Sequence, residues 1–149
     1  MFLEKSQNLF RTYYNKHYFI QGKFMQYIQS SSKSVQEVVQ SIQAIAPNHK
    51  FGVLSVRDMK ATLASKGFDL KEECQILDVC NPKVAFTFLS EDMSLANILP
   101  CKISVYTQEN ETIVSMSSLP QLVDDINPDF LELAQETQET LLQIIDEAV

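Results

Sequence analysis

The chain has 149 residues, of which 45% are hydrophobic and 21% charged, and its formal net charge is −7. These proportions are typical of one soluble globular domain, and no stretch approaches the ~20 apolar residues of a membrane span. The negative charge argues against general nucleic-acid binding, which requires cations that face phosphates. Because the first residues lack the apolar segment of a secretory signal, we expect a cytoplasmic protein with reduced thiols.

Residues 1–23 differ from the rest of the chain and are predicted to form an N-terminal extension. They hold four basic residues against one glutamate, and they are rich in aromatic side chains. Leu9, Phe10, Tyr13, Tyr14 and His17 recur at near-helical spacing, which favours a short amphipathic helix. We expect its aromatic residues to pack on the domain or on a second copy of the chain rather than on a membrane surface.

Residues 24–149 are predicted to form a single domain that begins with a strand over residues 24–29. Ser34 and Glu37 have the spacing of a capping box, and an apolar stripe at helical spacing follows as far as Ala46. Residues 51–56 are predicted to form a second strand, apolar enough to be central in a sheet.

The middle of the chain contains strong local signals for a short helix and a third strand. Asp58 is placed to cap a helix that extends through Ser65. Gly67 then supplies the left-handed residue that ends a helix, and Phe68 is expected to fold back on the last turn. Residues 74–80 are predicted to form a strand.

Asn81 and Pro82 are predicted to be the N-cap and first residue of the next helix, whose apolar stretch continues towards Pro100. Residues 101–106 and 112–116 alternate as the two strands of a hairpin. Asn127 and Pro128 repeat the cap-plus-proline pattern and open the last helix. Helices and strands therefore alternate irregularly, which predicts an α+β fold with helices packed on a mainly antiparallel sheet.

Several of these segments together resemble the family known as domain of unknown function 302, over most of residues 24–149. The matching residues are Phe51-Gly52-Val53-Leu54, Asp58-Met59, Gly67-Phe68, Ile76-Leu77-Asp78-Val79-Cys80-Asn81-Pro82, Ala85, Leu89, Leu99-Pro100-Cys101-Lys102-Ile103, Val105 and Pro120. The resemblance implies a small cytoplasmic bacterial domain with a curved antiparallel sheet of about five strands, similar to the TATA-binding-protein class, and a homodimer. It implies no DNA binding and no defined reaction.

Cys80 and Cys101 are the first candidates for chemistry, because each lies at a predicted strand boundary beside a proline. If the two strands are antiparallel neighbours, both thiols lie at the same end of the sheet. A disulfide would then require their α-carbons to be within about 4.4–6.8 Å. Cys80 also precedes a helix N-terminus, a position that lowers the pKa of a thiol. The alternative is that both are small buried hydrophobic residues.

Other residues around these cysteines are candidates for binding a ligand. The role of Asn81 and Pro82 as a helix cap is a sufficient explanation for their presence. The free backbone amides that follow them are also suited to binding an anionic ligand. Pro100 borders the same region, Asp78 is a candidate base, and Arg57 could pair with a carboxylate of a ligand. No metal site is predicted, because Cys74, His17 and His49 have no recognised ligand spacing with the other two cysteines. No cofactor is expected.

The leading hypothesis is that the chain is a homodimeric binding or accessory domain. The sequence favours a non-enzymatic role over an enzymatic one. Its site for a small ligand would lie where Cys80-Asn81-Pro82 meets Pro100-Cys101. The first alternative is a thiol redox or sulfur-carrier protein that uses Cys80 and Cys101. The second is a structural interaction module whose acidic C-terminal helix binds a protein partner.

Overall fold

A six-stranded antiparallel sheet forms the frame of the protein in the computed structural model, which describes residues 18–21 and 24–149. The strands are β1 (Tyr18–Gln21), β2 (Phe24–Ser31), β3 (Gly52–Asp58), β4 (Cys74–Cys80), β5 (Cys101–Gln108) and β6 (Glu111–Ser117). Their order across the sheet is β1-β2-β6-β5-β4-β3, and every neighbouring pair is antiparallel. The predicted α+β class and antiparallel sheet are confirmed.

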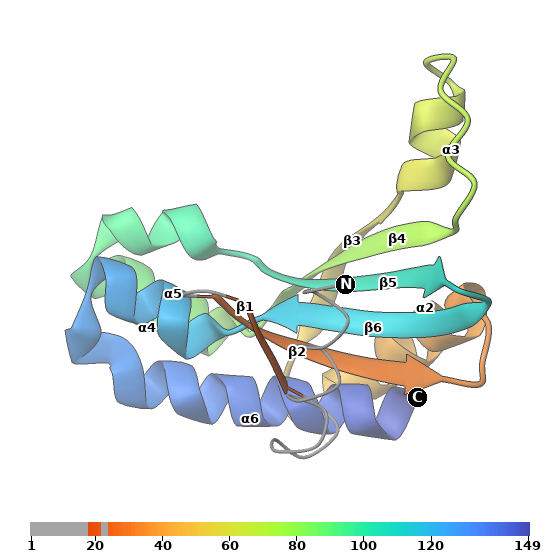
Figure 1. The fold of residues 1–149 in the computed structure, drawn as a ribbon. Helices are drawn as coiled ribbons and strands as arrows, with labels where there is room; N and C mark the ends of the chain where they lie inside the picture. Colours follow the sequence, from red (N-terminus) through yellow and green to blue (C-terminus); the bar gives the residue numbers. More distant parts are fainter. Residues whose placement is uncertain (1–17, 22–23) are drawn as a thin grey trace.

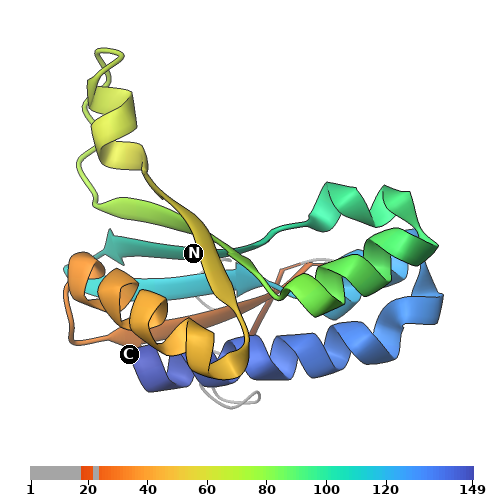
Figure 2. The same ribbon diagram turned by 180° about the vertical axis from the view of Figure 1, so that it is seen from behind.

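Most of the helices lie on one face of this sheet or beyond one of its ends, whereas the short helix at residues 59–64 projects from the opposite end of β3 and β4 (Figure 1; Figure 2). They are α2 (Val35–Ile45), η1 (Ala46–His49), α3 (Met59–Ala64), α4 (Pro82–Glu91), η2 (Met93–Ile98), α5 (Leu119–Ile126), η3 (Pro128–Phe130) and α6 (Leu131–Ala148), where η marks a 3-10 helix. None of the helices in the described residues is both long and apolar enough to cross a membrane.

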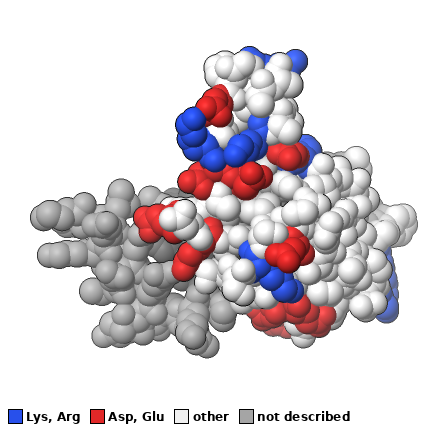
Figure 3. Space-filling model, turned by 90° about the vertical axis from the view of Figure 1, so that its right-hand side faces the viewer, with Lys and Arg blue, Asp and Glu red and all other residues white. Residues whose placement is uncertain are grey.

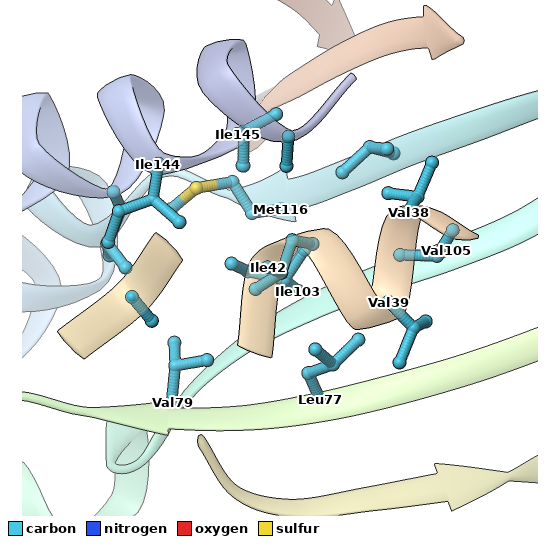
Figure 4. Packing of buried hydrophobic residues seen from close by; sticks show 14 of the residues in the cluster. Val38, Val39, Ile42, Leu77, Val79, Ile103, Val105, Met116, Ile144 and Ile145 are labelled. Atoms are coloured by element: carbon cyan, nitrogen blue, oxygen red, sulfur yellow. The ribbon is translucent and has the colours of Figure 1, made fainter. Parts of the chain in front are cut away.

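The larger hydrophobic core lies between the sheet and the helices α2 and α6. Alternate residues of the central strands point towards α2, among them Leu77 and Val79 of β4 and Ile103 and Val105 of β5 (Figure 4). They are met by Ile42 and its neighbours on α2, and by residues from the C-terminal part of α6. Strand side chains alternate between the two faces of a sheet. The intervening residues of β4 and β5 therefore point to the face opposite α2.

A second, smaller core holds together the helical end of the molecule, formed by α4, η2, α5 and the first half of α6. Its buried residues are Phe88, Leu95, Leu119, Val123 and Ala134. The rings of Phe88 and Phe130 meet edge to face with their centroids 5.7 Å apart. The buried Gln138 side chain accepts a hydrogen bond of 2.8 Å from the Leu119 amide and thereby joins α6 to the start of α5. Because α6 supplies residues to both cores, it connects the helical end to the sheet.

The predicted helix ends are confirmed where they depend on local capping. Ser34 and Glu37 form the capping box of α2, and the Asp58 side chain accepts the Ala61 amide at the start of α3. Gly67 has a φ of +89°, and the Phe68 amide donates to the Leu63 carbonyl, which closes the end of α3. The Phe68 side chain, however, does not pack on that helix and is exposed.

Three other sequence predictions need correction. Residues 51–56, predicted as a central strand, belong instead to the edge strand β3, which has a bulge between Val53 and Ser55 and leaves Leu54 exposed. Residues 18–21 of the predicted N-terminal extension form the strand β1 rather than a helix, whereas the positions that carry the predicted helix, from Leu9 to His17, lie outside the described residues. Helix α5 was not predicted, although Ser118 caps it and Pro120 lies in its first turn, a pattern that sequence reasoning overlooked.

Candidate functional site

The face of the sheet opposite α2 is the part of the molecule where the predicted ligand residues lie. No helix within the described part of the chain covers the middle of this face (Figure 1; Figure 2). We call it the open face. It carries the outward residues of the three strands β3, β4 and β5: Ser55, Arg57, Cys74, Ile76, Asp78, Cys80, Lys102, Ser104 and Tyr106.

Asp78 is the centre of an ionic cluster on the open face. The register places Ser55 of β3 on one side of it and Lys102 of β5 on the other. The Arg57 guanidinium and the Lys102 ammonium group both donate to the same oxygen, Oδ1 of Asp78, and each contact is 3.0 Å long. The Ser55 hydroxyl donates to the other oxygen, Oδ2, at 2.7 Å. One carboxylate is therefore shared by two cations from the strands that flank it.

This arrangement keeps Asp78 ionised and leaves the cluster with excess positive charge. The hydrogen bond from Ser55 lowers the pKa of the Asp78 carboxyl, and Lys102 and Arg57 lower it further against the opposing effect of burial. Only 15% of the Asp78 side chain is exposed, whereas Arg57 and Lys102 are about half exposed. Arginine has five donors and lysine three, so both keep donors that Asp78 does not use.

Cys80 and Cys101 lie near each other along the sheet but on opposite faces. Strands β4 and β5 are antiparallel neighbours, as a thiol pair requires, and Cys101 is directly opposite Val79. Cys101 therefore shares the core face with Val79 and packs against both hydrophobic clusters, while Cys80 lies on the open face with Asp78. Both cysteines are free, as is Cys74, so the predicted cysteine pair is not formed.

The surroundings of the three thiols do not activate them. Burial raises the pKa of Cys101 to about 11, and the nearby Cys80 adds to this effect. Burial also raises the pKa of Cys80, which is the opposite of the lowering expected from its place before a helix N-terminus. Burial and the negative charge of Asp58 raise the pKa of Cys74. Because the thiolate is the reactive form, all three are poor nucleophiles near neutral pH.

We predict that the folded protein reacts slowly with iodoacetamide at pH 7.5. Cys101 should be the slowest site, and the rates at all three thiols should increase as the pH rises towards their raised pKa values. Mass spectrometry of peptides after timed labelling measures each site, with a free cysteine peptide as the reference. Labelling of Cys80 faster than the reference peptide would contradict this prediction and restore the thiol hypothesis.

The remaining predicted residues border the open face at the ends of β4 and β5. The Asn81 side chain accepts hydrogen bonds from the amides of Lys83 and Val84 at 3.1 and 3.3 Å, and Pro82 begins α4. The capping part of the prediction is therefore confirmed, and the side-chain oxygen of Asn81 is already occupied. Pro100 is half-buried and directly precedes β5. The structure thus brings Asp78 and Arg57 together and leaves Asn81, Pro82 and Pro100 at the edge of the cluster.

Sequence reasoning missed two members of the cluster, Ser55 and Lys102. Their signal is the cross-strand register, which places both beside Asp78 and which the sequence does not reveal. Within the described ranges no three side chains among His, Cys, Asp and Glu are grouped as metal ligands. His49 lies 3.0 Å from Glu147 and is engaged there rather than with a cysteine.

The fold and the site define an α+β domain with an antiparallel sheet that is helix-covered on one face and bears an ionic cluster on the other. The family model of the domain of unknown function DUF302 matches residues 27–148, and the chain belongs to this family. A comparison with curated proteins finds no match. The chain is similar to the crystal structure of an uncharacterized conserved DUF302 protein from Bacillus stearothermophilus. The TM-score is 0.79 and the identity 29%, over 83% of this chain and 98% of that one.

Proposed function

We propose that the chain is a binding domain that takes up an anionic small ligand on its open face through Arg57 and Lys102. The observation that carries this proposal is the shared contact of both cations with one oxygen of Asp78. The ligand group that fits is an oxyanion, either a carboxylate or a phosphoryl group, because both accept hydrogen bonds from guanidinium and ammonium donors.

The charge of the cluster supports an anion rather than a cation. Two positive side chains face one carboxylate in a protein whose overall charge is −7, so the cluster is locally positive against an acidic background. Both cations have donors that an approaching anion can use. Ser104, two residues beyond Lys102 on β5, lies on the same face of the sheet and offers a hydroxyl group as a further donor. Cys80, Asn81, Pro82 and Pro100 form the proposed border of this site.

Asp78 acts as an internal competitor in this proposal. Its carboxylate occupies donors that an external oxyanion would otherwise use, and it holds both cations in place while the site is empty. Loss of its charge would leave two cations without a counter-charge on the open face. Variants of the three residues are therefore expected to change anion affinity in opposite directions, and this is the basis of the test.

The test is a titration of the protein with inorganic phosphate and, separately, with hexanoate, followed by backbone amide shifts in NMR spectra. We expect shifts at Ser55, Asp78 and Lys102 in the wild-type protein. Arg57→Gln should weaken binding about tenfold, the value of one charge-assisted hydrogen bond. Asp78→Asn should strengthen it, because both cations are then released.

Lys83→Gln is the matched control, because this exposed lysine lies on α4 outside the cluster. The affinity of this variant for each anion should equal that of the wild-type protein. A response to phosphate alone would identify a phosphoryl ligand, and a response to hexanoate alone a carboxylate. The proposal fails if neither probe shifts the cluster, or if Asp78→Asn and Arg57→Gln change the affinity in the same direction.

We propose further that this binding domain acts as a homodimer, as the family resemblance implies. The support from the fold is a set of large hydrophobic side chains that the described part of one chain leaves exposed. A thiol redox or sulfur-carrier role for Cys80 and Cys101 is the less favoured alternative, since the two side chains belong to opposite faces of the sheet. An interaction module that binds a protein partner through its acidic C-terminal helix, α6, is the other alternative and stays a prediction.

A further inference from the structure

A polar cavity lies at the end of the sheet where β5 turns into β6, opposite the helical end of the molecule (Figure 1). Its volume is about 370 Å³, which is within the range of small-molecule sites. The end of β2 and the turn to α2 supply Ser31 and Lys33 to its lining, and the start of β6 supplies Glu111 and Thr112. Ser31 and Thr112 are direct neighbours across the two strands. Every residue of the lining carries a polar or charged side chain, so the cavity is suited to a polar ligand.

Thr112 is the buried part of this lining. It is 6% exposed, and its hydroxyl group has no hydrogen-bond partner within the described part of the chain. The other buried polar residues of the described ranges all have one: Gln75, Ser118, Thr137 and Gln138. Buried polar groups without a partner are rare in folded proteins. Because Thr112 lines the cavity, a molecule in the cavity can bond to its hydroxyl group.

The lining also contains one cation and one anion, Lys33 and Glu111, which are not paired with each other. Neither takes part in an ion pair among residues 18–21 and 24–149. The half-buried Lys33 donates instead to the carbonyl oxygen of Ala148 at 2.8 Å, at the end of α6. Hydrogen bonds from Ser34 lower the pKa of the Glu37 carboxyl and Lys33 adds a smaller effect, so this neighbouring carboxylate is already engaged at the cap of α2.

These two charges determine which polar ligand the cavity favours. A simple anion would meet the negative charge of Glu111, and a simple cation would meet the positive charge of Lys33. Figure 3 views the molecule from this end and shows both basic and acidic side chains on it, rather than a surface of one sign. A ligand that carries both charges is therefore favoured over an ion of either sign.

We propose that this cavity binds a small zwitterion, an amino acid whose carboxylate pairs with Lys33 and whose ammonium group pairs with Glu111. Lys33 uses one of its three donors on Ala148, which leaves two for a carboxylate. The Thr112 hydroxyl group is a further donor to the same carboxylate, and such hydrogen bonds to a charged acceptor are strong. This inference goes beyond the proposed anion site, because the cavity shares no residue with the ionic cluster around Asp78.

The test is a titration of the full chain with glycine, β-alanine and γ-aminobutyrate, followed by backbone amide shifts in NMR spectra. The three ligands carry the same two charges at increasing separation, so the tightest binder measures the spacing that the cavity favours. We expect shifts at Lys33, Glu111 and Thr112 and none at Asp78. Glycinamide lacks the carboxylate and N-acetylglycine lacks the ammonium group. Each should bind the cavity at least about tenfold more weakly than glycine, since each loses one charge-assisted contact.

Three variants test the proposed contacts with the tightest of these ligands. Lys33→Gln and Glu111→Gln should each weaken binding about tenfold. Thr112→Val should also weaken binding without lowering the urea midpoint of the ligand-free protein, because its hydroxyl group has no partner there. Glu109→Gln is the matched control, since this exposed carboxylate lies two residues from Glu111 but outside the lining, and its affinity should equal that of the wild type.

The outcomes separate this inference from the proposed function. The inference is overturned if none of the three amino acids shifts the cavity, if glycinamide or N-acetylglycine binds there as tightly as glycine, or if Glu109→Gln weakens binding as much as Glu111→Gln. Shifts at the cavity with glycerol as large as those with glycine would also overturn it, because they would show a site for hydroxyl groups rather than for charges. In each case shifts at Asp78 with phosphate or hexanoate would leave the proposed anion site standing.

Discussion

Phe88→Ala is expected to lower the free energy of unfolding by about 3–5 kcal/mol, the usual cost of removing a fully buried aromatic side chain. Phe88 is 0% exposed and is the largest side chain in the core of the helical end. The rings of Phe88 and Phe130 pack edge to face, and the truncated side chain would leave a cavity between α4 and the helices that face it. Urea unfolding followed by far-ultraviolet circular dichroism measures the change in the transition midpoint.

Phe86→Ala is the control for this prediction, because the same substitution two residues away removes a ring that is 73% exposed. Its effect on the free energy of unfolding should stay within about 0.5 kcal/mol, as for most surface substitutions. Equal destabilisation by Phe86→Ala and Phe88→Ala would mean that α4 is rotated relative to the orientation described here. The measurement is made on dilute protein, so that any effect of Phe86 on dimerisation does not enter.

Leu77→Ala is expected to cost about 2–5 kcal/mol, the range for a large aliphatic residue in a packed core. Leu77 is 0% exposed at the centre of β4, where it lies beneath α2 among the residues of the larger core (Figure 4). Leu54→Ala is the matched control, because the same residue type is 65% exposed on the neighbouring strand β3. A cost for Leu54→Ala as large as that for Leu77→Ala would contradict the assignment of the bulge in β3.

Both destabilised variants should unfold in a single transition. Cys101 packs against both cores, and α6 contributes buried residues to each, so loss of one core removes part of the support of the other. Coincident transitions by circular dichroism and by tyrosine fluorescence would confirm this coupling. Two separate transitions in Phe88→Ala would show instead that the helical end unfolds independently of the sheet.

The sequence predicted those parts of the fold that depend on neighbouring residues. The caps at Ser34, Asp58 and Asn81 and the turn at Gly67 are local, because the side chain and the amide it binds are a few positions apart. The order of strands is not local. Residues 51–56 are apolar enough for a central strand, yet β3 lies at the edge, since apolar content does not determine which strands become neighbours.

The candidate site was predicted only in part, because its contacts also depend on which residues face each other across neighbouring strands. Asp78 and Arg57 were each identified from the sequence, but their contact and the role of Lys102 depend on the register of three strands. The cysteines illustrate the limit more sharply. The sequence placed both thiols at one end of the sheet only on the condition that β4 and β5 are antiparallel neighbours, which they are. The one-residue offset that sends Cys80 and Cys101 to opposite faces depends on the pairing register, which the sequence does not reveal.

The bulge in β3 determines how any partner can recognise this edge of the sheet. A regular edge strand offers a row of free amides and carbonyls to which another strand can add, whatever its sequence. In β3 the regular spacing of those groups is interrupted between Val53 and Ser55, and the strand continues directly into α3. Such an interruption makes the addition of a further strand along β3 less favourable, which is one of the ways in which edge strands avoid edge-to-edge aggregation.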